Sequence, residues 1–370
     1  MSELMKTFIY TLLVSIFFIS AAAGQGCVAV RHMSCAAPGL SSSDLFKQKH
    51  GKWQVNTGYR YFRSFRHFRG DVEEHERIEN NTEVVNLSHA LDLGLSFQPT
   101  NRLSFAVNVP LLYNDRSSLY EHYGNSLTAN PEQKRFYTHS AGIGDVRVSS
   151  SYWLIDPMKL KKYNVALGLG VKLPTGNYRV EGDFHKLDAE KQDYIIRRPV
   201  DQSIQLGDGG LGFSLELQAY LQLGNSTSLY ANGFYLFNPR ETNGVSRNPA
   251  SNSTAVDAEF SVPDQFAARL GISQTILPGL SVMLGGRAEG VPSKDLIGGS
   301  AGFRRPGYIV SVEPGVAYMK NGFSAAVTVP VALYRNRTKS FADLQDPTGQ
   351  RHGDAAFADY LISVNVSRWF

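Results

Sequence analysis

Apolar and polar residues alternate along many stretches of this 370-residue chain. In the last stretch, LISVNVSRWF, the even-numbered positions are mostly apolar and the odd-numbered positions mostly polar. The first set, or parity, includes Ile362, Val364, Val366 and Phe370, and the second includes Ser363, Asn365 and Ser367. Successive side chains of a strand point to opposite sides, so a period of two residues predicts a β-strand with one apolar face.

Twelve windows follow this rule, and we predict a strand in each. They are 53–61, 84–97, 103–111, 145–154, 163–173, 211–223, 228–237, 265–276, 280–290, 308–318, 323–333 and 361–370. In the window 228–237 both parities are apolar, so the sequence leaves open which side faces outward. The windows are about as long as the 9–11 residues that a tilted strand needs to cross a bilayer.

The links between the windows alternate strictly in length. The short links are 98–102, 155–162, 224–228, 277–279 and 319–322, and the long, polar links are roughly 62–84, 112–142, 175–209, 238–264, 291–307 and 334–357. Short turns at one rim and long loops at the other are typical of outer-membrane barrels. An open sheet edge cannot be satisfied in lipid, so the sheet must close. We therefore predict an all-β fold: a single closed antiparallel transmembrane β-barrel of twelve strands, with short periplasmic turns and long extracellular loops.

Aromatic residues gather at both ends of the windows. If the first strand runs outward, the outer rim has Tyr59, Tyr61, Tyr113, Phe213, Phe266, Tyr308 and Tyr360, and the periplasmic rim has Trp53, Phe97, Phe105, Tyr152, Tyr163, Tyr318, Phe323 and Phe370. Two aromatic belts with Leu and Val between them are expected of a lipid-facing wall. The alternative, a secreted soluble sandwich, needs an apolar interior but no rim-specific loop lengths.

The start of the chain indicates export to the envelope. Lys6 precedes an apolar stretch at 8–19 and then SAAAGQG, the pattern of a secretory signal with small residues at its cleavage site. We expect a signal peptide at 1–24, a periplasmic or lumenal segment at 25–50 and the barrel at 51–370. No later stretch approaches the roughly 18 apolar residues of a membrane helix. A net charge of +4 with 19% charged residues is too mild to indicate a nucleic-acid partner.

Two further features lie at the ends of the mature chain. Cys27 and Cys35 are the two cysteines, and in an oxidising compartment they are a candidate disulfide. Lipidation of Cys27 is the alternative, although GQG before it lacks the pattern of a lipoprotein signal. At the other end, Phe370 resembles the terminal aromatic of bacterial outer-membrane barrels, which the barrel assembly machinery recognises. Arg368 departs from that pattern, where an apolar residue is expected.

Charged residues on the polar parity are predicted to face the lumen. They are Asp92, Asp145, Arg147, Lys172, Glu216, Arg269, Arg287, Glu289 and Glu313. Such charges either pair with one another inside a wetted lumen or line a substrate path with opposed charges.

Other candidate chemistry is weaker. The stretch FRHFRGDVEEHE offers oxygen and imidazole ligands for a divalent cation: His67, Asp71, Glu73, Glu74, His75 and Glu76. A solvated charged loop is the preferred interpretation of this stretch, and we expect no metal or other cofactor. GDGGLG at 207–212 matches a dinucleotide fingerprint by letter, but a strand rather than a helix follows it. For a hydrolase, His89 has leucines as same-face neighbours, and nothing in the sequence brings Ser150 to it.

Three prolines lie near the predicted outer ends of strands. Pro110, Pro174 and Pro330 cannot donate to a sheet ladder, so they predict bulges or local breaks in the wall. Such breaks either shape the wall or form a lateral opening beside a ligand path.

Three segments between about 140 and 225 carry a family resemblance. SAGIGDVRVSSSYWL, VALGLGVKLPTGNY and QLGDGGLGFSLEL resemble the outer-membrane transporters of the meta-pathway of phenol degradation, and YLFNPRETNGV is also similar to bacterial relatives. The resemblance implies a barrel that passes small hydrophobic or aromatic compounds and implies no catalytic residues.

From these patterns we expect a non-enzymatic channel of the bacterial outer membrane. Its partners would be outer-membrane lipids, the assembly machinery and a small-molecule substrate. The alternatives are a non-transporting surface or structural protein whose long loops bind a partner and, third, an outer-membrane hydrolase.

Overall fold

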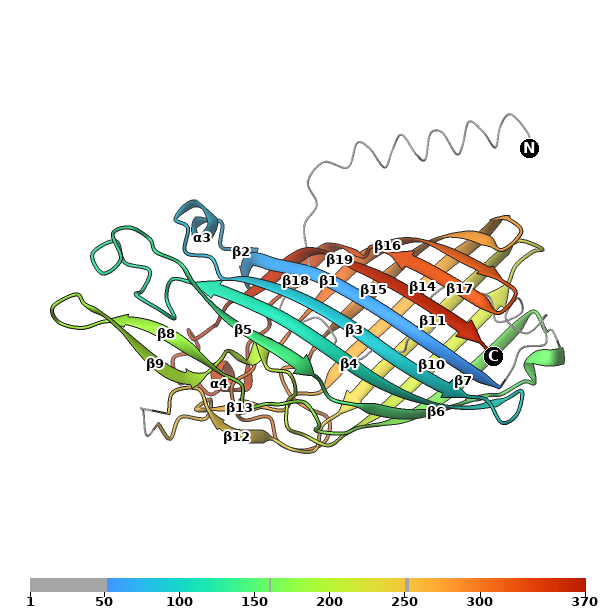
Figure 1. Cartoon of the computed structure of the whole chain (residues 1–370), viewed down its shortest axis with the longest axis horizontal. Helices are drawn as coiled ribbons and strands as arrows, with labels where there is room; N and C mark the ends of the chain where they lie inside the picture. Colours follow the sequence, from blue (N-terminus) through green and yellow to red (C-terminus); the bar gives the residue numbers. More distant parts are fainter. Residues whose placement is uncertain (1–51, 160, 250–252) are drawn as a thin grey trace, which may run out of the picture.

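The computed structural model describes residues 52–159, 161–249 and 253–370, and these form a closed antiparallel barrel of twelve strands (Figure 1). The wall consists of β1 (Trp53–Arg69), β3 (Val85–Phe97), β4 (Leu103–Ser118), β5 (Phe136–Ile143) continued by β6 (Arg147–Trp153), β7 (Tyr163–Lys172), β10 (Gly212–Gln222), β11 (Thr227–Phe237), β14 (Gln265–Leu277), β15 (Leu280–Val291), β16 (Gly307–Lys320), β17 (Phe323–Thr328) continued by β18 (Val331–Asn336), and β19 (Ala355–Trp369). The predicted fold class is confirmed.

The first and last strands close the barrel. β1 pairs with β19 from Gln54↔Trp369 to Phe68↔Ala355, with bulges around Ser64. Phe370 extends the closure by one residue, because its N–H donates to the Trp53 carbonyl at 2.8 Å. The wall therefore has no free edge at this seam, as a barrel in lipid requires.

Each strand presents an apolar side outward. In β19 Val366 is exposed while Ser363 and Ser367 are buried, and in β7 and β14 the outward Leu169 and Leu270 are about two-thirds exposed. Large apolar side chains this exposed would be unfavourable in water, so the outer face suits acyl chains. The facing of β11, which the sequence left open, is settled by Tyr230, Phe234 and Leu236, whose side chains are buried inside the barrel.

Turn chemistry accounts for the short rim. Asn321 and Gly322 join β16 to β17 with φ of 49° and 75°, the pair of positive φ angles that a tight two-residue hairpin needs. Pro278 and Gly279 join β14 to β15 with a different turn: proline holds a negative φ at the first position and Gly279 alone has a positive φ, 81°, as in a type II turn. A 3-10 turn, Pro157–Lys159, lies in the link between β6 and β7.

The long links contain structure of their own. They hold β2 (Val72–Glu73), α3 (Glu76–Glu79), the hairpin of β8 (Glu181–Leu187) and β9 (Asp193–Pro199), the 3-10 turn Gln202–Ile204, the hairpin of β12 (Thr242–Ser246) and β13 (Glu259–Ser261), and α4 (Phe341–Leu344). In Figure 1 these elements gather at one end of the barrel, opposite the C-terminus. Among the described residues, no helix is long and apolar enough to cross a bilayer.

The predicted link boundaries are wrong at the long-loop end. β1 runs to Arg69, β4 to Ser118, and β5 begins at Phe136, so parts of the predicted links 62–84 and 112–142 are strand. The added segments, such as YNDRSS at 113–118, are polar on both parities. A strand that extends past the apolar band no longer needs an apolar outward side, so the alternation that identifies it disappears.

Candidate functional site

The wall is interrupted next to Pro110. On β4, Leu111 pairs with Ile143 of β5 and Asn108 pairs with Arg147 of β6, so residues 144–146 bulge out of the ladder. Thr175 satisfies this interrupted backbone: its hydroxyl donates to the Gly144 carbonyl at 2.9 Å and accepts from the Val146 N–H at 2.8 Å. The break that Pro110 predicted is present. A second break, between β17 and β18, lies at Pro330.

The three motifs that carry the family resemblance meet at this first break. Asp145 accepts the Gly176 N–H at 2.9 Å and the Asp208 N–H at 3.1 Å. Lys172 pairs with Asp208 and lies 4.0 Å from the Asp145 carboxylate. Residues of the GIGD, LPTG and GDGG segments thus form one polar cluster, which we call the break cluster: Asp145, Lys172, Thr175, Gly176 and Asp208.

Glycine is required in the break cluster by close backbone approach. A Cβ added at Gly207 would lie 2.6 Å from the Asp145 carboxylate and 2.6 Å from the Gly176 carbonyl. A cavity of about 80 Å³ lies beside the cluster, lined in part by Pro110, Leu112 and Leu206. GDGGLG therefore serves packing here, and the strand β10 begins at its last residue, Gly212, as predicted.

The structure brings most of the predicted lumen charges into ion pairs. Seven of the nine have residue exposures of 9% or less: Asp145, Arg147, Lys172, Arg269, Arg287, Glu289 and Glu313. The ion pairs are Arg147–Glu216, Arg269–Glu313 at 3.2 Å, Arg287–Glu289 at 2.7 Å and Arg287–Glu313 at 3.5 Å. Asp92 pairs with Arg60 at 3.0 Å. That these charges shape passage through the lumen stays a prediction.

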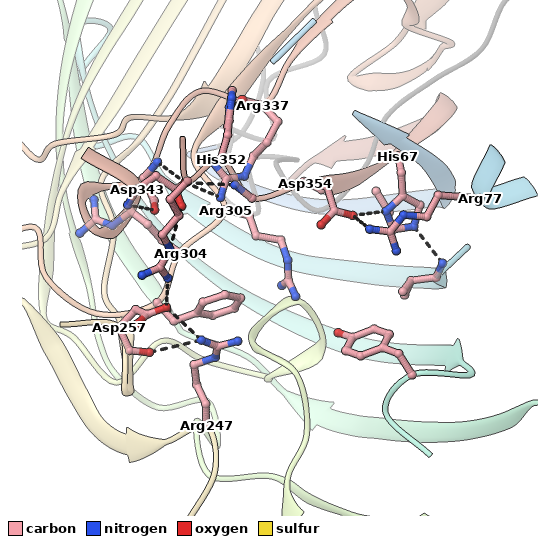
Figure 2. Close-up of a pocket in the computed structure, with 18 of the residues that line it drawn as sticks. His67, Arg77, Arg247, Asp257, Arg304, Arg305, Arg337, Asp343, His352 and Asp354 are labelled. Atoms are coloured by element: carbon pink, nitrogen blue, oxygen red, sulfur yellow. Dashed lines mark hydrogen bonds and ion pairs between the residues drawn. The ribbon is translucent and has the colours of Figure 1, made fainter. Parts of the chain in front are cut away.

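A cavity of about 510 Å³ lies at the long-loop end, and we call it the vestibule. Figure 2 shows two groups of its labelled side chains, with Arg305 extending between them. His67, Arg77 and Asp354 lie on one side, and Arg247, Asp257, Arg304, Arg337 and Asp343 lie on the other. Its lining joins β1, β4 and β19 to five long links. Its lining has seven arginines and three aspartates. The arginines are Arg77, Arg116, Arg247, Arg304, Arg305, Arg337 and Arg351, and the aspartates are Asp257, Asp343 and Asp354.

The candidate cation ligands near the first long link already form hydrogen bonds and ion pairs with other residues. His67, Glu74 and Asp354 offer three ligand atoms within 4.8 Å of one another. However, His67 accepts the Val84 N–H at 2.8 Å through Nε2, which leaves Nδ1–H to donate to Asp354 at 2.6 Å. Arg77 binds both Glu74, at 2.9 Å, and Asp354, at 2.7 Å. A guanidinium already neutralises these carboxylates, so the cluster suits a structural role better than a metal site.

The remaining candidates are dispersed. His89 bonds the Tyr59 hydroxyl at 2.8 Å and lies among Tyr61 and Tyr113 in a rim cluster. His89 of β3 pairs with Tyr113 of β4, and Ser150 of β6 pairs with Phe105 of the same strand. Eight residues of β4 separate these two partners, so at 3.3 Å per residue His89 and Ser150 lie about 26 Å apart. They cannot act as nucleophile and base together. Cys27 and Cys35 lie outside the described residues.

Sequence reasoning missed the vestibule. Its arginines come from separate long links, in segments such as SRNP, FRRPG and GQRHG, which have no common spacing. A high density of arginine in polar links was the available signal, and it does not say which links converge.

No protein-family model and no curated protein matches the chain. Among solved structures, the fold is similar to the COG4313 outer membrane channel from Pseudomonas putida F1, with a TM-score of 0.55 and 14% identity over 87% of this chain and 97% of that chain. The P. putida toluene transporter TodX has a TM-score of 0.44 and 12% identity over 92% and 95% of the two chains. The CymD monoaromatic hydrocarbon channel has a TM-score of 0.43 and 9% identity over 94% and 98%. The first similarity supports the barrel fold, whereas the resemblance to the phenol meta-pathway family is not confirmed.

Proposed function

We propose that this protein is a bacterial outer-membrane channel that passes small, hydrophobic or aromatic molecules. The observation that carries the proposal is the vestibule, a cavity of about 510 Å³ inside the loop end of a closed barrel. Cavities of roughly 300–1,000 Å³ hold small organic molecules. Because β1, β4 and β19 contribute to its lining, a molecule held there is already at the mouth of the barrel.

Two further observations support this proposal. The outward Leu and Val side chains and the aromatic rims suit insertion in a membrane. A solved structure of similar fold is described as an outer membrane channel. The proposal of an aromatic cargo comes from the motif resemblance, whose residues form the break cluster beside a cavity lined in part by Pro110, Leu112 and Leu206.

A non-transporting structural barrel is the second candidate. It is favoured by the buried, mutually paired charges inside the barrel, since Glu289 and Glu313 are 1% exposed or less. A network of this kind fills space as well as it lines a path.

Single-channel recording separates the two. Purified, heat-modifiable protein in a planar bilayer is expected to give discrete current steps, which protein heated to unfolding should not give. A folded protein that never conducts would contradict the channel and support the structural barrel.

A further inference from the structure

The vestibule has more cationic groups on one side than its carboxylates neutralise. Arg247 lies 3.1 Å from Asp257, Arg351 lies 2.6 Å from Asp257 and 3.3 Å from Asp343, and Arg337 lies 3.3 Å from Asp343. Three guanidinium groups therefore share two carboxylates.

The other arginines of the vestibule have carboxylate partners of their own. Arg77 pairs with Glu74 and Asp354, and Arg116 pairs with Glu121. Arg304 pairs with Asp295 through two bonds of 2.6 Å, and Arg305 pairs with Asp201 through bonds of 2.8 and 2.7 Å. Each of these two is a bidentate pair, which fixes the guanidinium in place. The excess charge is thus confined to Arg247, Arg337 and Arg351, which we call the arginine triad. Arg247 and Arg337 are labelled in Figure 2.

Burial makes the charge of one triad member, Arg337, unfavourable. It lowers the pKa of Arg337 to about 10, and the neighbouring Arg305 adds to the effect. Burial and Arg305 likewise lower the pKa of Arg247. Moreover, Nε of Arg337 is buried and has no hydrogen-bond partner among the described residues. A bound anion would supply the missing negative charge.

Phe303 positions one member of the triad. Its ring centroid lies 3.6 Å from the Arg247 guanidinium and 4.7 Å from the Arg305 guanidinium. Stacking of this kind restricts the guanidinium plane, so less freedom is lost when Arg247 binds an anion. The lining also has one exposed aromatic side chain that suits an uncharged body, Tyr120.

We propose that the vestibule binds small organic carboxylates, with the carboxylate against the arginine triad and the apolar body towards Tyr120. This rests on the proposed channel function and names its substrate class as aromatic or apolar acids rather than neutral hydrocarbons. Guanidinium groups suit carboxylates because two parallel N–H groups match two oxygens.

The test compares benzoate with benzamide, which has nearly the same shape without the charge. Titration calorimetry on the folded protein in detergent is expected to show binding of benzoate and not of benzamide. Arg247→Gln and Arg351→Gln should each weaken benzoate about tenfold, equivalent to about 1.4 kcal/mol. Both side chains are more than 40% exposed, so the variants should fold. Arg197→Gln, at an exposed ion pair of the β8–β9 hairpin, removes the same charge elsewhere and should change nothing.

Asp257→Asn gives a test of opposite sign. It removes the carboxylate that Arg247 and Arg351 share, so benzoate should bind several-fold more tightly. Equal binding of benzoate and benzamide, or no response to Arg247, Arg351 and Asp257 substitutions, would overturn the proposal. Calorimetry measures binding without any current. A protein that binds benzoate but does not conduct would therefore refute the channel and still support the carboxylate site. A protein that conducts but does not bind benzoate selectively would support the channel and refute the carboxylate site.

Discussion

Arg287 shows how single residues hold charge inside the barrel. Its guanidinium bonds Glu289 at 3.0 and 2.7 Å and lies 3.5 Å from Glu313, and all three residues are nearly inaccessible. Breaking such a pair leaves buried charge uncompensated. We expect Arg287→Gln to lower the free energy of unfolding by about 3–5 kcal/mol.

Urea titration of the heat-modifiable form would measure this effect. Arg197→Gln is the matched control, because its side chain is 63% exposed and surface pairs contribute about 0–1 kcal/mol. Equal midpoints for the two variants would show that the Arg287 network does not stabilise the barrel. If the lumen conducts, Arg287→Gln should also change ion selectivity.

His122 predicts a pH effect in the loops. Burial, with the charges of His185, Lys186 and Arg198, lowers its pKa to about 4, although Glu121 opposes this. The Nδ1 atom of His122 accepts the backbone N–H of His185 at 3.1 Å, and protonation of Nδ1 would prevent this hydrogen bond. The folded loops bind this proton less well than the unfolded chain does, so their stability is full above about pH 6.5 and falls as the pH drops towards 4.

Limited proteolysis of the β8–β9 hairpin across this pH range would detect the loss. A His122→Gln variant keeps an acceptor but does not titrate, so its cleavage should depend less on pH. The same pH dependence in both proteins would assign the effect to other groups, such as the pair of His185 and Asp193.

At the scale of elements, the wall break depends on close backbone contact. A methyl group at Gly207 would collide with Asp145 and with the Gly176 backbone, whereas one at Gly224 would meet nothing within 4 Å. We expect Gly207→Ala to cost about 1–3 kcal/mol. The folded fraction in outer membranes should fall for Gly207→Ala and stay unchanged for Gly224→Ala. Equal fractions would mean that the break relaxes freely.

The terminal residue is the last link in the closing seam. Phe370 exchanges backbone hydrogen bonds of 2.8 and 3.3 Å with Trp53, and its side chain is mostly exposed. Deleting it should reduce the heat-modifiable form in outer membranes, because one closing pair and the predicted assembly signal are lost together. Phe370→Tyr keeps the backbone and an aromatic ring and should retain that form. Wild-type levels after deletion would refute a role in assembly.

Elements were predictable from the sequence where lipid imposes a pattern. Leu169 and Leu270 are apolar because they face outward, and Arg287 and Glu289 took the other parity because charge is costly in hydrocarbon. Beyond the apolar band this constraint ends, so the upper parts of β1 and β4 could not be predicted. The arginine triad could not be predicted either, since loop convergence depends on contacts that have no period.

At the scale of the whole molecule, orientation can be tested by labelling. In a background with Cys27→Ser and Cys35→Ser, an impermeant thiol reagent on intact cells should label cysteine at Asn125 and Asn248, both exposed on long links. It should not label cysteine at Asn321, in the turn between β16 and β17. The reverse result would place the long links in the periplasm.

The seam between β1 and β19 also sets an order of events in time. Partners such as Gln54 and Trp369 are separated by most of the sequence, so the ladder cannot close until β19 has been made and exported. Loop-closure entropy grows only slowly with length, so the delay adds little to the thermodynamic cost. During that delay, however, β1 presents an unpaired edge, and unpaired edges recruit other strands. A chain cut short before β19 should therefore be a substrate for periplasmic chaperones and proteases, however well its other hairpins have formed.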